Sequence, residues 1–141
     1  MLKNIKGMND ILPPDSSTWW ELESKIISVI KNYGFQYIQT PIVEPTELFN
    51  RTLGSETDIV SKEMYSFIDE LNNDNLSLRP EGTTSVVRSC IQHSLTYDHS
   101  PKLFYSGPMF RHERPQKGRS RQFHQIGVEA IGSEYGFIDV E

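Results

Sequence analysis

The sequence has a single cysteine, no long apolar run, and no internal repeat or low-complexity tract. Cys90 cannot form an internal disulfide, which fits the reducing conditions of the cytoplasm. No segment approaches the roughly 20 apolar residues of a membrane-spanning helix, and the first residues lead into polar, proline-rich sequence where a secretory signal would be apolar. We therefore expect a cytoplasmic protein with neither a membrane span nor a signal peptide, in which Cys90 is a buried thiol.

The chain does have enough length and apolar content for one folded domain. Its 141 residues, 36% hydrophobic and 23% charged, have the balance of a water-soluble globular protein. The net charge of -5 argues against binding nucleic acid over the whole surface. One stretch reverses the sign, because residues 102–121 carry a single anion, Glu113, and six cations: Lys102, Arg111, Arg114, Lys117, Arg119 and Arg121. This local basic patch indicates one place where phosphate groups are bound.

Periodic apolar residues predict the helices. Steps of three and four residues predict an amphipathic helix over 19–33 that ends at Gly34. Polar residues precede it, and Thr18 is placed to form a capping box with Glu21. A short helix is expected over 46–53. Another is expected after Gly82, with these residues on its inner side: Val86, Val87, Cys90, Ile91 and Leu95.

Strands are expected between these helices and after the last of them. The predicted ranges are 37–40, 64–69, 75–79, 102–105, 108–113 and 122–132, with a polar turn at 70–74. Strands and helices occur in blocks without regular alternation, so the predicted fold class is α+β, an antiparallel sheet flanked by helices. Residues 138–141 resemble the first turn of a helix with acidic residues at its positive end, so we expect a truncated chain.

The last two predicted strands place polar side chains on one surface. Alternation sends Arg111 and Glu113 to one face, with Phe110 and His112 opposite. In the final strand, alternation separates two sets of side chains. The apolar set on one face, assigned to a core, is Ile126, Val128 and Ala130. The mostly polar set on the other face is Phe123, Gln125, Gly127 and Glu129. Half-buried amide and carboxylate groups lower stability unless a ligand or partner satisfies them. If the two strands pair, this face is therefore a candidate binding surface.

Two connections carry further polar groups. The loop 114–121 is too long and too charged for a simple hairpin turn; its cations could cover polyphosphate or contact a nucleic-acid backbone, and the alternative is a solvated, salt-bridged hairpin with a loose basic tip. Residues 78–84 (LRPEGTT) mark a strand-to-helix junction, where free backbone N–H groups and a carboxylate can bind a small polar ligand. The alternative there is a cap by Thr83 or Thr84, with Glu81 in solvent.

Together these segments resemble the class II aminoacyl-tRNA synthetases, and within them the histidyl-tRNA synthetases. The Pro41-centred segment 37–67 is similar to motif 1 and its sequel, and residues 110–113 (FRHE) match the Phe-Arg-x-Glu core of motif 2. Residues 114–125 (RPQKGRSRQFHQ) are similar to the histidyl version of the motif 2 loop, and 78–83 (LRPEGT) is another histidyl hallmark. The resemblance covers nearly the whole chain, in the family's order.

The resemblance implies that histidine and ATP form histidyl-adenylate and pyrophosphate, and that histidine then passes to tRNA(His). The nucleophile is the substrate's own carboxylate, so the protein aligns the reactants and stabilises charge. Arg111 would be the catalytic residue, binding the α-phosphate and the carboxylate. The other implied ATP contacts are Glu113 at the adenine amino group, Phe123 stacked on adenine, and Arg119 and Arg121 at the phosphates or the tRNA acceptor end. Mg²⁺ is expected with ATP, and no metal ligand is assigned.

The resemblance also implies a histidine pocket. Besides Arg111 and Gly82, its residues would be Glu81, Thr83 and Gln125 at the α-ammonium and Glu129 at the imidazole. A buried carboxylate of this kind rejects substrates that lack the matching N–H. The two histidines beside the site, His112 and His124, are assigned to packing or surface roles on the opposite face.

Three family features are not found in residues 1–141: the third class II motif, the histidine-specific segment and the anticodon-binding domain. The chain is therefore expected to be the N-terminal portion of a class II catalytic domain, inactive or incomplete alone. Motif 1 implies a homodimer. Two alternatives stay open. One is the synthetase-like regulatory subunit of ATP phosphoribosyltransferase, which would be expected to lose the basic loop, and the other is a non-catalytic dimerisation fragment.

Overall fold

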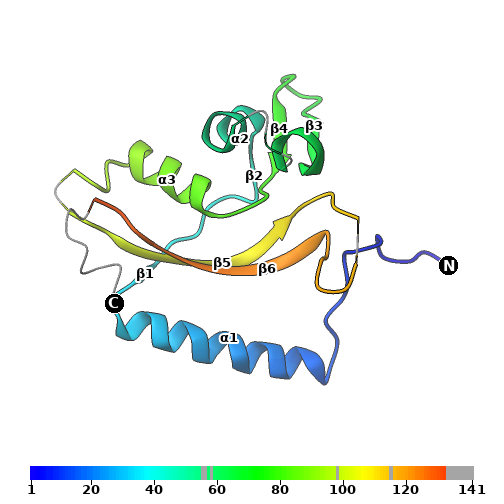
Figure 1. Cartoon of the computed structure of the whole chain (residues 1–141), viewed down its shortest axis with the longest axis horizontal. Helices are drawn as coiled ribbons and strands as arrows, with labels where there is room; N and C mark the ends of the chain where they lie inside the picture. Colours follow the sequence, from blue (N-terminus) through cyan, green and yellow to red (C-terminus); the bar gives the residue numbers. More distant parts are fainter. Residues whose placement is uncertain (55–56, 58, 98, 115, 133–141) are drawn as a thin grey trace.

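A three-stranded sheet forms the centre of the fold. In this computed structural model its strands lie in the order β1–β5–β6 and span Gln36–Tyr37, Lys102–Phe110 and Gln122–Ala130. Helix α1, Asp15–Asn32, runs along one face of the sheet, and helix α3, Thr83–Gln92, lies over the other (Figure 1). The predicted α+β class is confirmed. The structure describes these residues: 1–54, 57, 59–97, 99–114 and 116–132.

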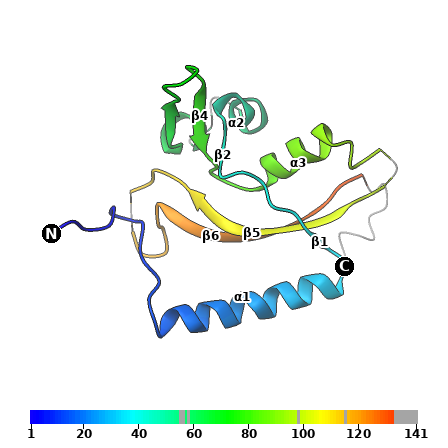
Figure 2. The ribbon, with the colours of Figure 1, turned by 180° about the vertical axis from the view of Figure 1, so that it is seen from behind.

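A second, smaller sheet lies beside α3. Its antiparallel strands have the order β2–β4–β3 and span Val43–Pro45, Asn75–Leu78 and Ser66–Ile68. Helix α2, Thr46–Leu53, has the predicted bounds, and a π-helical turn, Ile59–Glu63, leads toward β3. Seen from behind, α2 and this sheet lie on the same side of the β5–β6 pair as α3 (Figure 2). The predicted strands 64–69 and 75–79 are thus confirmed as a shorter hairpin. Of the predicted strand 37–40, only Tyr37 belongs to a strand, the two-residue β1.

The long β5–β6 hairpin is the frame of the site. Its strands pair antiparallel from Lys102 opposite Ala130 to Phe110 opposite Gln122. The prediction of separate strands at 102–105 and 108–113 was wrong, because Pro108 does not interrupt the pairing. The backbone carbonyl of Pro108 points away from β6 and accepts a hydrogen bond from Arg79. The backbone nitrogen of a strand residue points to the same side as its carbonyl, so the N–H that proline lacks is not needed for pairing with β6. The expected antiparallel sheet was wrong in one pair, since β1 runs parallel to β5.

Helix α1 begins without the predicted capping box. It starts at Asp15, directly after Pro14, and no side chain caps it. Glu21 pairs instead with Lys25 one turn later, at 2.7 Å. The predicted end is confirmed, since the helix stops at Asn32 and Gly34 adopts a positive φ of 80°. Among the described residues no helix is both long and apolar enough to cross a membrane, and the acidic segment 138–141 lies outside the described residues.

The hydrophobic core lies between β5 and α3. Its buried members are Val86, Cys90, Leu103, Tyr105 and Met109. The predicted inner side of α3 is confirmed for Val86 and Cys90, but it was wrong for Ile91 and Leu95, which are 74% and 38% exposed. A ten-residue helix that crosses the sheet buries only the narrow stripe that faces the strands.

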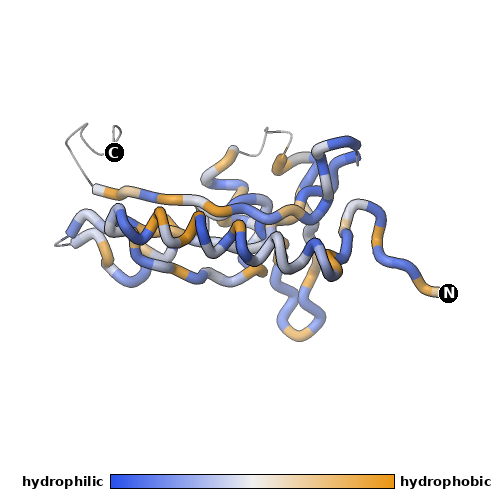
Figure 3. Tube along the Cα trace, turned by 90° about the horizontal axis from the view of Figure 1, so that it is seen from below, coloured by the Kyte–Doolittle hydropathy of each residue, from blue (hydrophilic) through white to orange (hydrophobic). Residues whose placement is uncertain are grey.

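The face of the sheet toward α1 is less buried than expected. Ile126, Val128 and Ala130 were assigned to a core, yet Val128 is 49% exposed and Ala130 is also exposed. None of the residues of α1 is buried, and apolar positions recur along its exposed trace (Figure 3). The apolar set of β6 therefore faces a helix that covers it only in part.

The hydroxyl of Tyr65 is buried and has no hydrogen-bond partner among the described residues. The Tyr65 ring packs edge-on against His112, with 5.1 Å between ring centroids. Because an unpaired buried hydroxyl destabilises a fold by about 1–3 kcal/mol, we expect Tyr65→Phe to leave the free energy of unfolding unchanged or to raise it by about 1 kcal/mol. Urea unfolding measures this, with Tyr97→Phe at an 85% exposed site as the matched control. A clear loss of stability in Tyr65→Phe alone would contradict the expectation.

Candidate functional site

The register of the β5–β6 hairpin decides which side chains share a face. Met109 lies opposite Phe123, Gly107 opposite Gln125, and Leu103 opposite Glu129. Directly opposed residues of an antiparallel pair point to the same side, so the predicted grouping of the odd-numbered residues of β6 is confirmed. This is the face toward α3.

Arg111 and Glu129 lie at opposite ends of this face and contact one continuous segment. Arg111 Nε donates to the carbonyl of Pro80 at 2.9 Å, and Thr83 Oγ1 donates to Glu129 Oε1 at 2.7 Å. The loop before α3, together with the first residue of α3, therefore bridges the two ends of the face. The requirement that Arg111 and Glu129 share one side of the sheet is met.

Arg111 follows the strand and does not belong to it. The backbone N–H of Arg111 donates to Arg121 at 2.9 Å, but that of Glu113 turns back to Arg111 and that of His112 bonds Glu63. The expectation that 111–113 continue the strand was therefore wrong. The guanidinium carbon of Arg111 lies 5.1 Å from the centroid of the Phe123 ring, a distance at which a cation and an aromatic face attract each other.

A cavity of about 410 Å³ opens beside Arg111. Its lining includes four of the predicted ATP contacts: Arg111, Glu113, Arg119 and Phe123. The basic loop adds Gly118 and Ser120, and the π-helical turn adds Ile59 and Glu63. Its walls thus combine two arginines, two carboxylates and an aromatic ring. A polar nucleotide fits these properties better than an apolar ligand does.

The basic loop folds back on the site and does not form a loose tip. Arg119 Nη1 lies 3.2 Å from Glu113 Oε2, and Gly118 has a positive φ of 81° in the turn between Gln116 and Arg119. Arg121 is not part of the cavity lining; its Nε donates to the Glu113 carbonyl at 3.0 Å. Because Arg119 is 62% exposed, its ion pair contributes little stability, and the side chain is free to exchange this partner for a phosphate.

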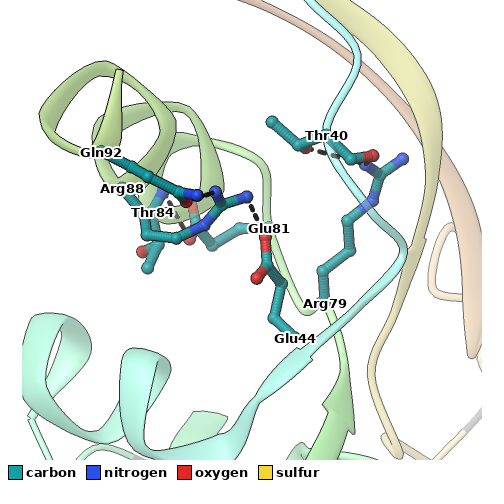
Figure 4. Close-up of polar contacts among 7 residues, drawn as sticks. All are labelled: Thr40, Glu44, Arg79, Glu81, Thr84, Arg88 and Gln92. Atoms are coloured by element: carbon teal, nitrogen blue, oxygen red, sulfur yellow. Dashed lines mark hydrogen bonds and ion pairs between the residues drawn. The ribbon is translucent and has the colours of Figure 1, made fainter. Parts of the chain in front are cut away.

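Glu81 caps helix α3. Its two carboxylate oxygens accept the backbone N–H groups of Thr83 at 2.7 Å and Thr84 at 3.0 Å, and Figure 4 shows the side chain directed at the start of the helix. The alternative of a threonine cap with Glu81 in solvent was therefore wrong. The cap fixes the Glu81 carboxylate beside Thr83, and each oxygen keeps a lone pair for a ligand.

Of two further predicted residues, Gln125 has an environment that suits a ligand and Gly82 is explained by packing. Gln125 Oε1 is buried and has no hydrogen-bond partner among the described residues, which is the state expected of an acceptor that awaits a ligand N–H. Gly82 is required by space, because a Cβ atom there would lie 2.3 Å from the ring of Tyr105.

Cys90 behaves as a structural thiol. It is 2% exposed in the core beneath the site, as predicted. Burial raises the pKa of Cys90, and the nearby negative charge of Glu129 raises it further. The thiol is therefore protonated and unreactive at neutral pH.

The sequence reading missed the polar frame around the site. Arg79, 6% exposed, donates to the carbonyl and hydroxyl of Thr40 and to the carbonyl of Pro108, at 3.1–3.2 Å. Arg88 donates to the buried carboxylate of Glu44 at 2.7 Å, and Figure 4 shows both pairs on either side of β2 and the loop before α3. The only sequence signal was the position of Arg79 at the end of a predicted strand, between Leu78 and Pro80.

His124 packs on the face opposite the polar one, as expected. Its ring lies 3.0 Å from Glu23 and edge-on to Trp19, both on α1. The same expectation was wrong for His112, whose ring contacts Tyr65 beside the smaller sheet, on the side of α3 (Figure 2). Within the described part of the chain, no three His, Cys, Asp or Glu side chains are grouped to hold a metal ion.

The architecture is that of a class II aminoacyl-tRNA synthetase core. The solved structure of the apo S. aureus histidyl-tRNA synthetase superimposes with a TM-score of 0.81, at 40% identity over 99% of this chain and 31% of that one. A sequence profile described as histidyl-tRNA synthetase matches residues 7–141, and the chain belongs to that family.

Two more relatives show how much of the family's length this chain covers. The histidine–tRNA ligase of Acidovorax ebreus (strain TPSY) is 60% identical over 137 residues, which are 97% of this chain and 32% of the relative. A Bacillus halodurans C structure described as an ATP phosphoribosyltransferase regulatory subunit/histidyl-tRNA synthetase has a TM-score of 0.81 at 25% identity, over 99% of this chain and 35% of that one. The chain spans about a third of the length of the curated relatives it matches.

Proposed function

We propose that the protein acts as a histidine–tRNA ligase, with residues 1–141 as the N-terminal portion of the catalytic domain and the carrier of part of its site. One observation carries this proposal: the face of the β5–β6 pair that has the cavity and Arg111 at one end has Glu129, bonded to Thr83, at the other. A nucleotide and an amino acid could therefore lie end to end, with Arg111 at their junction.

The first reaction needs alignment and charge stabilisation. A carboxylate oxygen of histidine attacks the α-phosphorus of ATP, a new P–O bond forms, and the bond to the leaving pyrophosphate breaks. Arg111, held by Pro80 and lying beside Phe123, would bind the carboxylate and an α-phosphate oxygen with its planar guanidinium. This brings together two anions that repel each other in water and stabilises the charge of the transition state. Histidine then passes to the terminal ribose of tRNA(His).

The remaining ATP contacts would come from motif 2. Phe123 would stack on adenine, and Glu113 would accept from the adenine amino group after Arg119 releases it. Arg119 and Arg121 would bind phosphates or the tRNA acceptor end. Mg²⁺ would enter with ATP, bound to the phosphates of the nucleotide.

Histidine would lie over the centre of the β5–β6 face. Glu81, Thr83 and Gln125 would accept hydrogen bonds from the α-ammonium, and Glu129 would accept one from the imidazole N–H. The buried, unpartnered Gln125 Oε1 supports this assignment. The proposal includes a cytoplasmic homodimer whose interface involves the motif 1 region.

Two measurements test this function. The full-length gene product should exchange pyrophosphate into ATP only when histidine is present. Calorimetry on residues 1–141 should give heat with ATP and with histidine, because both proposed subsites would lie on the described face. Absence of histidine-dependent exchange would favour the regulatory-subunit alternative, and absence of heat from either ligand would favour a dimerisation module. The retained basic loop favours the ligase over the regulatory subunit.

A further inference from the structure

Segment 1–8, which lies before helix α1, is joined to the end of the basic loop. The carbonyl of Gly7 accepts the backbone N–H groups of Arg121 at 2.7 Å and of Gln122 at 3.0 Å, where the loop enters β6. The chain turns tightly over residues 5–8, with a backbone hydrogen bond of 2.9 Å between the ends of the turn and a positive φ of 86° at Gly7. The segment passes beside the connection between β5 and β6 (Figures 1 and 2). It therefore belongs to the same end of the hairpin as the basic loop.

Segment 1–8 adds two cations to this end of the molecule. Lys3 and Lys6 are both exposed, and Lys6 is the direct neighbour of the bound Gly7. Because three residues span at most about 11 Å of backbone, Lys3 also stays near the loop. Segment 1–8 contains no acidic residue, and residues 111–121 carry five cations and one anion. This part of the surface is therefore positive on a protein whose net charge is -5.

The two lysines are placed beside the proposed ATP cavity and not in it. The described residues that line this cavity include none from segment 1–8. The segment is bonded to the backbone of Arg121, which does not line the cavity either and whose Nε donates to the carbonyl of Glu113. The anion that suits these lysines is therefore one that extends beyond the cavity, as the phosphate backbone of a nucleic acid does.

We propose that segment 1–8 is a second contact for tRNA(His), in which Lys3 and Lys6 bind backbone phosphates of the acceptor arm beside the basic loop. The inference rests on the proposed function and adds a binding surface to it. Lysine ammonium groups neutralise phosphates and release condensed counterions without reading sequence, so these contacts strengthen binding and leave specificity to other residues. Because the hydrogen bonds of the Gly7 carbonyl already hold the segment, less conformational freedom is lost when the tRNA binds.

The test removes both charges in the full-length gene product. For the double variant Lys3→Ala/Lys6→Ala we expect the Kd for tRNA(His) at about 0.15 M salt to rise about ten- to thirtyfold, and the slope of log Kd against log salt concentration to fall by about 1.5 to 2. Fluorescence anisotropy with labelled tRNA(His) measures both quantities. Histidine-dependent pyrophosphate exchange needs no tRNA, so its rate and its KM values for ATP and histidine should match those of wild type.

Two matched variants control for charge and for folding. Lys25→Ala/Lys31→Ala removes the same charge from exposed positions of α1 and should leave the Kd for tRNA(His) and its salt slope unchanged. Lys3→Arg/Lys6→Arg keeps the charge of the segment and should bind tRNA(His) like wild type.

The two assays together decide the inference. An unchanged Kd in the alanine variant of segment 1–8, a rise without a change in the salt slope, or an equal rise in the α1 control would each overturn it. An equal fall in pyrophosphate exchange would also overturn it, because the segment would then support the fold of the site. Wild-type protein without histidine-dependent exchange would instead remove the proposed function on which the inference rests.

Discussion

We expect Arg111→Ala to lower histidine-dependent pyrophosphate exchange by about a hundred- to a thousandfold, the usual effect of removing one preorganised group that stabilises transition-state charge. Arg111 is the only side chain in the described part of the chain that both lines the cavity of about 410 Å³ and bonds the loop before α3. Its loss would leave the carboxylate and the α-phosphate without a shared cation at the moment they approach each other.

The size of this effect depends on preorganisation. Arg111 is held by three neighbours, through the ladder bond to Arg121, the Nε bond to Pro80 and the face of Phe123. A group fixed in this way needs no reorganisation when charge develops on the reacting atoms. Arg111→Lys keeps the charge but loses the planar pair of donors, so we expect it to recover only a small part of the rate.

Controls separate this loss from unfolding. Arg51→Ala removes an arginine that is 80% exposed on α2 and should leave exchange unchanged. Circular dichroism of Arg111→Ala should retain the wild-type spectrum, since Arg111 follows the strand and is not part of the core. Near-wild-type exchange in Arg111→Ala would refute its assigned role.

The sequence predicted which side chains share a strand face better than it predicted the fold around that face. Alternation over 122–132 was sufficient to group Phe123, Gln125 and Glu129, because the side-chain period of a strand follows from backbone geometry alone. It could not locate the core, because both faces of β6 carry apolar residues and only tertiary packing decides which face α3 covers. The incorrect split of β5 into strands 102–105 and 108–113 has a similar cause. A proline fits in a strand where its backbone nitrogen faces no partner strand. The sequence does not show that β1 pairs with β5 only at Leu103 and Phe104, which leaves Pro108 without a partner on that side.

The polar interior was the least predictable part. Glu81 and Arg79 look like solvated residues of a charged loop, since charged side chains are seldom buried without partners. Their partners are backbone groups far along the chain or at the next helix, which leave no residue-type signal. Tyr105 shows the same difficulty: the glycines that make room for its ring, Gly82 and Gly127, stand 23 and 22 residues from it in the sequence.

We expect Arg79→Met to reduce the free energy of unfolding by about 3 kcal/mol, the largest stability effect of any polar substitution considered for this chain. Arg79 links three segments through its side chain and backbone, since it also accepts from Phe110 at 3.0 Å and donates to Ile42 at 2.9 Å. Methionine replaces the apolar stem of arginine but leaves the carbonyls of Thr40 and Pro108 buried without their donors. Two unsatisfied acceptors account for this magnitude.

The burial of Arg79 indicates why its bonds are strong. Burial lowers the pKa of Arg79, while Tyr37, Tyr105 and Glu44 raise it, and an arginine remains charged under these opposing effects. Charge-assisted hydrogen bonds to carbonyls are stronger than neutral ones. Urea unfolding of the full-length gene product checks the expectation, with Arg51→Met as the matched surface control that should change stability by less than about 0.5 kcal/mol. Equal midpoints for the two variants would mean that the Thr40 and Pro108 carbonyls find other donors. The loop before α3 would then be positioned by its bond from Arg111 and by its cap at Glu81.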